Sequence, residues 1–228
     1  MHSSALISVT LLSLCVLTDS IAQESARALV KISAGEATAL VDTNDTPDLK
    51  DWGSKAGTLC VEWFPKISKL LPSEGFTAPN QVTIYFDPKM KGVAHALGGK
   101  ITISAAFVRG HQDDWGMVVH ELTHVVQAYP PGGPGWLVEG IADYIRIVHF
   151  EPQAPRPKID PAKASYKDAY KTTAMFLEWI EKQHGADFVV KMNAALRQGK
   201  YQDALWSELT GKNVDELWSA FVKTLMTP

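Results

Sequence analysis

The chain has 228 residues, and 46% of them are hydrophobic, which is enough for one domain with a sizeable core. Charged residues make up 21% of the chain, and the formal net charge is −3. The chain therefore lacks the basic surplus typical of proteins that bind nucleic acid or anionic membranes, and these numbers argue against both kinds of partner.

Residues 1–22 are predicted to be a signal peptide. An apolar run from Ala5 to Leu17 is followed by Ser20-Ile21-Ala22, a small-x-small pattern suited to signal peptidase. The run is shorter than the roughly 20 residues that a membrane-spanning helix needs. We therefore expect a secreted or periplasmic protein without a membrane anchor, in which residues 23–228 form a single domain with Cys60 as its one cysteine.

The first half of the mature chain predicts strands and one long helix. Val30–Ala34 alternates weakly in the manner of a strand, and the apolar positions of Pro47–Leu71 recur at steps of three and four, as in a helix. Gln81–Asp87 and Lys100–Ala106 are rich in β-branched residues and predict strands. The glycine-rich segment Gly92–Lys100 between them is expected to be a loop.

From residue 113 onward the pattern becomes helical. Asp113 or Asp114 is the expected N-cap of a helix that ends at the proline-rich and glycine-rich segment 130–135. Further helices are predicted over Trp136–Val148, Tyr166–His184, Phe188–Arg197, Tyr201–Leu209 and Val214–Met226. The element order predicts an α+β fold with a small N-terminal sheet and a helical C-terminal half.

The sequence HELTH, at residues 120–124, predicts a catalytic zinc site. Residues four apart lie on the same side of a helix, so His120 and His124 can bind one ion. Glu121 lies about 100° around the helix and can act as general base toward a zinc-bound water without being a ligand. Shuffled chains of this composition contain the motif roughly once in a hundred, so the motif alone is not conclusive. The predicted helix with an apolar face around it strengthens the interpretation.

A third ligand is expected on the next helix, where two carboxylates lie four residues apart. Glu139 is the predicted ligand, and Asp143 is the predicted acceptor that orients a histidine N–H group. Gly140 and Ala142 are small enough to let this helix pack closely against the HELTH helix. The reverse assignment of the two acids is the alternative, and without HELTH they would be interpreted as solvated surface acids.

HELTH followed by E-G-x-A-D at residues 139–143 resembles the gluzincin metallopeptidases, including the thermolysin-like group. In that group a glutamate on the second helix completes the zinc site, and an acid four residues later supports a ligand histidine. The segments HELTHVVQAY and GWLVEGIADYIRI are similar to those of the plant and bacterial basic secretory protein family of peptidases, and the likeness extends over about residues 25–225. The net charge of −3 departs from the family's name.

The resemblance implies a zincin-like fold in which Lys100–Ala106 is the edge strand above the cleft, where a peptide substrate can add as a strand. It also implies a tyrosine that stabilises the oxyanion of the transition state, because related gluzincins place one on a helix downstream of the metal site. Tyr170 is the candidate and Tyr166 its competitor, although either can be a packing residue.

The sequence therefore predicts an exported peptidase with one catalytic Zn²⁺ and a peptide or protein substrate. Hydrolysis of another kind of amide is an alternative within the same class. A secreted zinc-binding or defence protein with little turnover is the alternative from another class. The presence of Glu121 favours the enzyme, because a purely structural zinc site has no need of that carboxylate.

Overall fold

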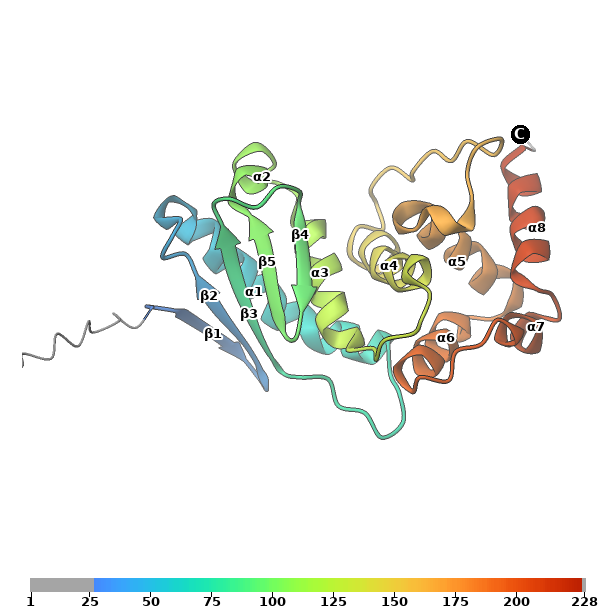
Figure 1. The fold of residues 1–228 in the computed structure, drawn as a ribbon, viewed down its shortest axis with the longest axis horizontal. Coiled ribbons are helices and arrows are strands. Elements are labelled where there is room, and N and C mark those ends of the chain that lie inside the picture. Colours follow the sequence, from blue (N-terminus) through green and yellow to red (C-terminus); the bar gives the residue numbers. More distant parts are fainter. Residues whose placement is uncertain (1–26, 227–228) are drawn as a thin grey trace, which may run out of the picture.

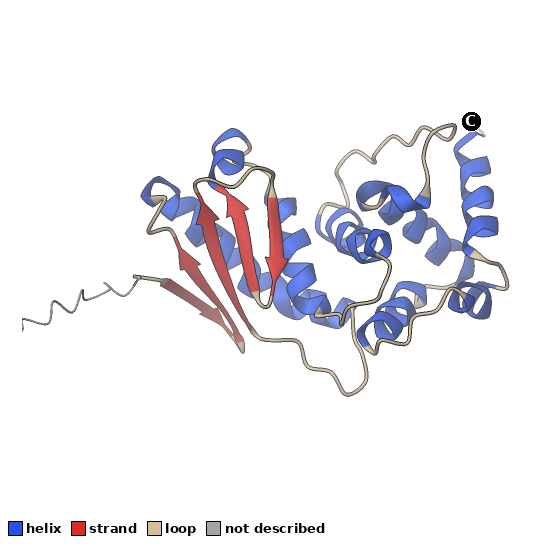
Figure 2. Cartoon of the chain, in the orientation of Figure 1, coloured by secondary structure: helices blue, strands red, loops and turns tan. Residues whose placement is uncertain are grey.

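The computed structural model describes residues 27–226, so the predicted signal peptide lies outside the described residues. It has a five-stranded sheet at one end and a group of helices at the other, as Figures 1 and 2 show. The coarse prediction of a mixed α and β fold is confirmed. Within residues 27–226, no helix combines the length and the apolar character that a bilayer span requires.

The sheet half contains five strands, a 3-10 turn at Pro47–Leu49 and two helices. In chain order the regular elements are β1 (Val30–Ala34), β2 (Ala37–Asp42), α1 (Lys50–Leu70), β3 (Gln81–Asp87), β4 (Ala94–Leu97), β5 (Lys100–Ser104) and α2 (Ala105–Gly110). The strand order is β1-β2-β3-β5-β4. The inner pairs β2–β3 and β3–β5 are parallel, and the two outer pairs are antiparallel.

The predicted edge strand is wrong. The strand that begins at Lys100 is β5, which lies between β3 and β4, and its residues Ile101 and Ile103 are fully buried. The edge is β4, which comes from the segment that was expected to be a loop. Gly98 and Gly99 both have positive φ (56° and 79°), as the two central residues of a tight hairpin turn require, and they fold β4 back onto β5.

Helix α1 packs closely on the sheet because it carries glycine where the two surfaces meet. A Cβ atom at Gly57 would lie 2.6 Å from Ile32 Cδ1 and 2.9 Å from Val41 Cγ2. Helix α3 (Trp115–Gln127) also contacts α1 and the sheet, and Figure 1 shows it between β4 and the helices of the C-terminal half. Asp114 caps α3 by accepting a hydrogen bond from the Met117 N–H group, as one of the two predicted caps.

The helical half contains α4 (Gly135–Tyr144), a π-helical segment η2 (Ile145–Phe150), a 3-10 turn (Tyr166–Asp168), α5 (Tyr170–His184), α6 (Phe188–Arg197), α7 (Ala204–Thr210) and α8 (Val214–Met226). Two predicted helices are interrupted. The helix from Trp136 widens after Tyr144, where the Glu151 N–H group bonds five residues back to the Arg146 carbonyl. The helix from Tyr166 breaks at Ala169, whose φ of 60° is incompatible with a right-handed helix.

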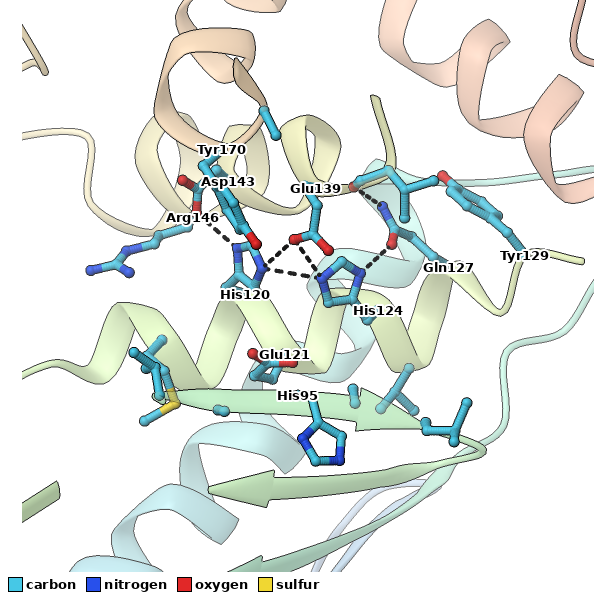
Figure 3. Close-up of a pocket in the computed structure, with 18 of the residues that line it drawn as sticks. His95, His120, Glu121, His124, Gln127, Tyr129, Glu139, Asp143, Arg146 and Tyr170 are labelled. Atoms are coloured by element: carbon cyan, nitrogen blue, oxygen red, sulfur yellow. Dashed lines mark hydrogen bonds and ion pairs between the residues drawn. The ribbon is translucent and has the colours of Figure 1, made fainter. Parts of the chain in front are cut away.

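Gly140 does not serve the contact predicted for it. A Cβ atom at this position would lie 2.2 Å from Cγ2 and 2.6 Å from Cβ of Thr173, which belongs to α5. The glycine therefore allows α4 to pack closely on α5, rather than on the HELTH helix. The side of α4 that carries Glu139 and Asp143 is left to face α3 (Figure 3).

Candidate metal site

Three potential metal ligands converge where α3 meets α4. The Nε2 atoms of His120 and His124 are 3.1 Å apart, and Glu139 Oε2 lies 3.1 Å from the first and 3.3 Å from the second (Figure 3). They form a group of histidine and acidic side chains that could hold a metal ion. His120 and His124 come from one face of α3, whereas Glu139 comes from α4.

Each imidazole is held from behind by a hydrogen-bond acceptor. His120 Nδ1 lies 2.8 Å from Asp143 Oδ1, and His124 Nδ1 lies 2.7 Å from Gln127 Oε1. An acceptor at Nδ1 favours the tautomer that carries its proton there, so the Nε2 lone pair is directed at the other two ligand atoms. Asp143 thus lies on the far side of the His120 ring from Glu139.

The spacing of the three atoms fits a small cation. Ligand atoms bound tetrahedrally to zinc at about 2.0–2.1 Å are separated by about 3.4 Å, close to the observed edges of the triangle. Without a positive charge, two lone pairs and a carboxylate would face one another at these distances. The residues present therefore fit Zn²⁺ by donor type, number and spacing.

The electrostatics of the site also favour positive charge. Burial disfavours the protonated form of His120, but hydrogen bonds with Asp143 and Glu139 outweigh it and raise the pKa of His120 to about 9. Burial likewise disfavours the carboxylate of Glu139, yet hydrogen bonds with the two imidazoles lower the pKa of Glu139 to about 2. The carboxylates around the histidines thus favour a positive charge at this position, either a proton on His120 or a bound metal ion.

Glu121 lies on α3 beside the two histidines but does not join the triangle. The residue is buried, and its Oε2 atom has no hydrogen-bond partner within the described part of the chain. Burial, the largest influence, raises the pKa of Glu121. A buried carboxylate oxygen without a partner is costly for stability, and such groups concentrate at functional sites.

Of the two tyrosines considered as oxyanion donors, the structure brings only Tyr170 to the site. The ring centroid of Tyr170 is 6.0 Å from that of His120, and the nearby charge of Glu139, followed by burial, raises the pKa of Tyr170. The Tyr166 hydroxyl instead donates to Asp215 Oδ1 at 2.9 Å, away from the site. Tyr170 is the first residue of α5, and its φ of 48° is left-handed.

The site opens into a cleft of about 1010 Å³ that runs between β4, α3, α4 and the turn before α5. Three further residues line this cleft, and the sequence alone had assigned a definite role to none of them. His95 comes from β4 and lies near Glu121 (Figure 3), and Gln127 supports His124. Arg146 forms ion pairs with Asp114 at 2.7 Å and with Glu151 at 3.1 Å.

A weak signal in the sequence marked two of these three residues, Gln127 and Arg146. Gln127 lies one turn after His124, and Arg146 lies three residues after Asp143, so helical geometry alone places each near the site. Their hydrogen-bond partners depend on how the elements pack. His95 had no such signal, because its strand was not predicted.

A family model described as a peptidase of plants and bacteria matches residues 63–221. The chain belongs to this family. The membership confirms the family predicted from the segments HELTHVVQAY and GWLVEGIADYIRI.

The solved structures similar to this peptidase-family chain include two of an M1 zinc metallopeptidase from Deinococcus radiodurans. One is a mutant bound to a Tyr-Ser-Ala substrate, with 14% identity and a TM-score of 0.48, covering 86% of this chain and 51% of the other. The second structure of that enzyme has 13% identity, a TM-score of 0.48 and coverages of 86% and 50%. The chain therefore spans about half the length of these structures. A comparison with curated proteins finds no match.

Proposed function

We propose that this protein is an exported zinc metallopeptidase in which His120, His124 and Glu139 bind the ion and Glu121 is the general base. The observation that carries the proposal is the buried, unpartnered Glu121 oxygen beside three converging ligand atoms. Membership of a peptidase family supports a peptide or protein substrate. Export rests on the apolar, small-x-small pattern of residues 1–22.

A zinc ion bound by these three side chains would supply Lewis acidity and lower the pKa of a coordinated water to about 7. Glu121 would accept a proton from a water molecule as the oxygen of that water adds to the scissile carbonyl carbon. Glu121 would then return that proton to the leaving nitrogen as the C–N bond breaks. Asp143 and Gln127 would hold the two imidazoles in the orientation that ligation requires.

Two further groups would act on the substrate. The Tyr170 hydroxyl would donate to the oxyanion that develops on the carbonyl oxygen. Strand β4 lines the cleft and has no second neighbour in the sheet of the described residues, so the backbone of an extended peptide could pair with it. The edge that the family resemblance implies is therefore assigned to β4 in this proposal.

The general-base role is tested by comparing wild type with Glu121→Gln, using zinc content and hydrolysis of a mixed peptide library as the measurements. We expect Glu121→Gln to retain zinc and to lose about 10²–10⁴-fold in kcat. Glu208→Gln, at an exposed position on α7, is the matched control and should behave as wild type. Equal hydrolysis by wild type and Glu121→Gln would refute the mechanism, and bound zinc without any hydrolysis would favour the binding or defence protein.

The third ligand is tested by metal affinity alone. We expect Glu139→Ala to abolish tight zinc binding, whereas Asp143→Ala should weaken it by about 10–100-fold, as loss of a supporting hydrogen bond does. The assignment fails if only the Asp143 change abolishes binding.

Tyr170→Phe should leave zinc affinity unchanged and lower kcat by about 10²-fold, with little change in KM.

Export is tested separately from catalysis. The full chain, expressed in a host with a signal peptidase, should appear outside the cytoplasm with residue 23 as its new amino terminus, as mass spectrometry would show. Retention of the intact amino terminus inside the cell would contradict this part of the proposal.

A further inference from the structure

Gln127 is the last residue of α3 and connects the two helices that carry the candidate ligands. The residue is 2% exposed. Its Oε1 atom lies 2.7 Å from His124 Nδ1, and its Nε2 atom donates to the Val138 carbonyl at 3.0 Å. Val138 immediately precedes Glu139 in α4, so one side chain links a candidate ligand on α3 to the backbone beside another on α4.

The direction of the Gln127 amide follows from its partners. A backbone carbonyl can only accept a hydrogen bond, so the amide nitrogen must face Val138. The amide oxygen then faces His124, which must carry its proton on Nδ1 to complete the pair. This arrangement selects the tautomer whose Nε2 lone pair points toward His120 and Glu139.

The backbone of the same residue is anchored independently. Arg197, a buried residue of α6, donates from Nε to the Gln127 carbonyl and from Nη2 to the Val126 carbonyl, both at 3.1 Å. Its Nη1 atom donates to the Leu71 carbonyl at 2.8 Å, just after α1. The carboxyl end of α3 is therefore held in place, which limits the positions that the Gln127 side chain can adopt.

We propose that Gln127 is a positioning residue that fixes the tautomer and orientation of His124 for zinc binding and holds α3 in register with α4. This inference rests on the proposed function, since it assigns a role at the same metal site. Gln127 acts on His124 as Asp143 acts on His120, but with a neutral acceptor. A neutral amide avoids a further negative charge near Glu121 and Glu139. Unlike a carboxylate, the amide can also donate a hydrogen bond to the Val138 carbonyl.

Substitutions can separate the acceptor role from the donor role of the amide. Gln127→Leu has a similar size but neither accepts nor donates a hydrogen bond. Gln127→Glu keeps an acceptor for His124 and loses the donor to Val138, so two buried oxygens would face each other. Gln183→Leu, at an exposed position of α5, makes the same chemical change away from the site and serves as the control.

The experiment measures the zinc dissociation constant by chelator competition, and the imidazole N–H resonances of the zinc-loaded protein by ¹⁵N-histidine NMR. We expect Gln127→Leu to weaken zinc binding by about 10–100-fold and to lose the protected Nδ1–H resonance of His124, while that of His120 remains. Gln127→Glu should keep the His124 resonance and bind zinc about tenfold more tightly than Gln127→Leu. Its midpoint of thermal unfolding should still be lower than that of wild type. The control should match wild type in every measurement.

The outcomes distinguish this proposal from the one on which it rests. Wild-type affinity and an unchanged His124 resonance in Gln127→Leu would overturn the positioning role and leave the zinc site intact. Affinity in Gln127→Glu no better than in Gln127→Leu would also overturn it. If Gln127→Leu does not fold, absence of the His124 resonance from Gln127→Glu decides against the proposal. Failure of the wild-type protein to bind zinc would instead refute the proposed function.

Discussion

The two halves of the molecule fill their cores with different kinds of side chain. The sheet half is mostly aliphatic where it is most deeply buried, at residues that include Ile67, Ile84, Ile101 and Ile103, with Phe86 as its fully buried ring. The helical half is built around contacting aromatic rings: Trp136, Tyr166, Phe176, Trp179, Phe188, Trp206, Trp218 and Phe221.

This difference shows how the candidate site depends on both halves. The aliphatic half supports α3 and with it His120, Glu121 and His124. The aromatic half supports α4, and with it Glu139, through the close contact between α4 and α5. Tryptophan and tyrosine rings also carry polar groups that need hydrogen-bond partners when they are buried. The Trp206 N–H group, for example, donates to the Tyr201 hydroxyl at 2.9 Å. The two ligand-bearing helices thus rest on cores with different tolerance to substitution.

The largest expected effect is the loss of a fully buried ring. Trp206→Ala should lower the free energy of unfolding by about 3–5 kcal/mol, because it removes the ring that contacts Trp136, Phe176 and Phe188. Ile103→Ala, in the sheet half, should cost about 2–4 kcal/mol. Denaturant unfolding measures both values. An equal or larger cost for the isoleucine would contradict the view that the aromatic core is the more demanding one.

The close contacts at glycine should also separate the halves. Gly140→Ala should destabilise by about 1–3 kcal/mol and weaken zinc binding, because the new methyl group meets the Thr173 Cβ atom, which cannot move independently of its backbone. Gly57→Ala meets the flexible end of Ile32 at 2.6 Å and the Val41 Cγ2 atom at 2.9 Å, which are less severe contacts. The higher helix propensity of alanine offsets part of the cost at both positions. Thermal unfolding together with zinc titration would refute this prediction if the Gly57 change proved the more damaging.

A smaller effect is expected at the turn before α5. Ala169 has φ 60° and ψ −166°, a conformation that is nearly restricted to glycine. Ala169→Gly should therefore stabilise the protein by about 1 kcal/mol, since relief of strain exceeds the added entropy of the unfolded chain. Thermal unfolding of this variant beside Ala164→Gly, outside any regular element, gives the comparison. Equal destabilisation of both would argue against strain at Ala169.

The smallest effect concerns pH in the helical half. Burial raises the pKa of Glu181 even though hydrogen bonds from Tyr144 and the Val189 N–H group oppose the shift. A raised carboxyl pKa in the folded state means that stability is greatest below the unfolded value and declines as the pH rises through the folded value. Glu181→Gln cannot ionise, so its free energy of unfolding should rise relative to that of wild type as the pH increases from the unfolded glutamate pKa of about 4.3 through the higher folded pKa. A constant difference between the two across this range would contradict the prediction.

The sequence by itself determined the parts of the site that lie within single helices. The spacing of His120 and His124 is a property of one turn of helix, and the cap at Asp114 depends on residues only three positions away. The same local logic located the long helix from Lys50 and the strands at Gln81 and Lys100. These predictions needed no knowledge of what packs against them.

Tertiary structure alone decided the relations between elements. It places Glu139, rather than Asp143, against both Nε2 atoms, brings Tyr170 rather than Tyr166 to the site, and joins Gln127 to His124. The edge position of β4 also became clear only when the glycine turn paired it with β5. The physical reason is that periodicity specifies which side of a helix or strand a residue occupies, whereas the partner on that side depends on the packing of segments far apart in the chain.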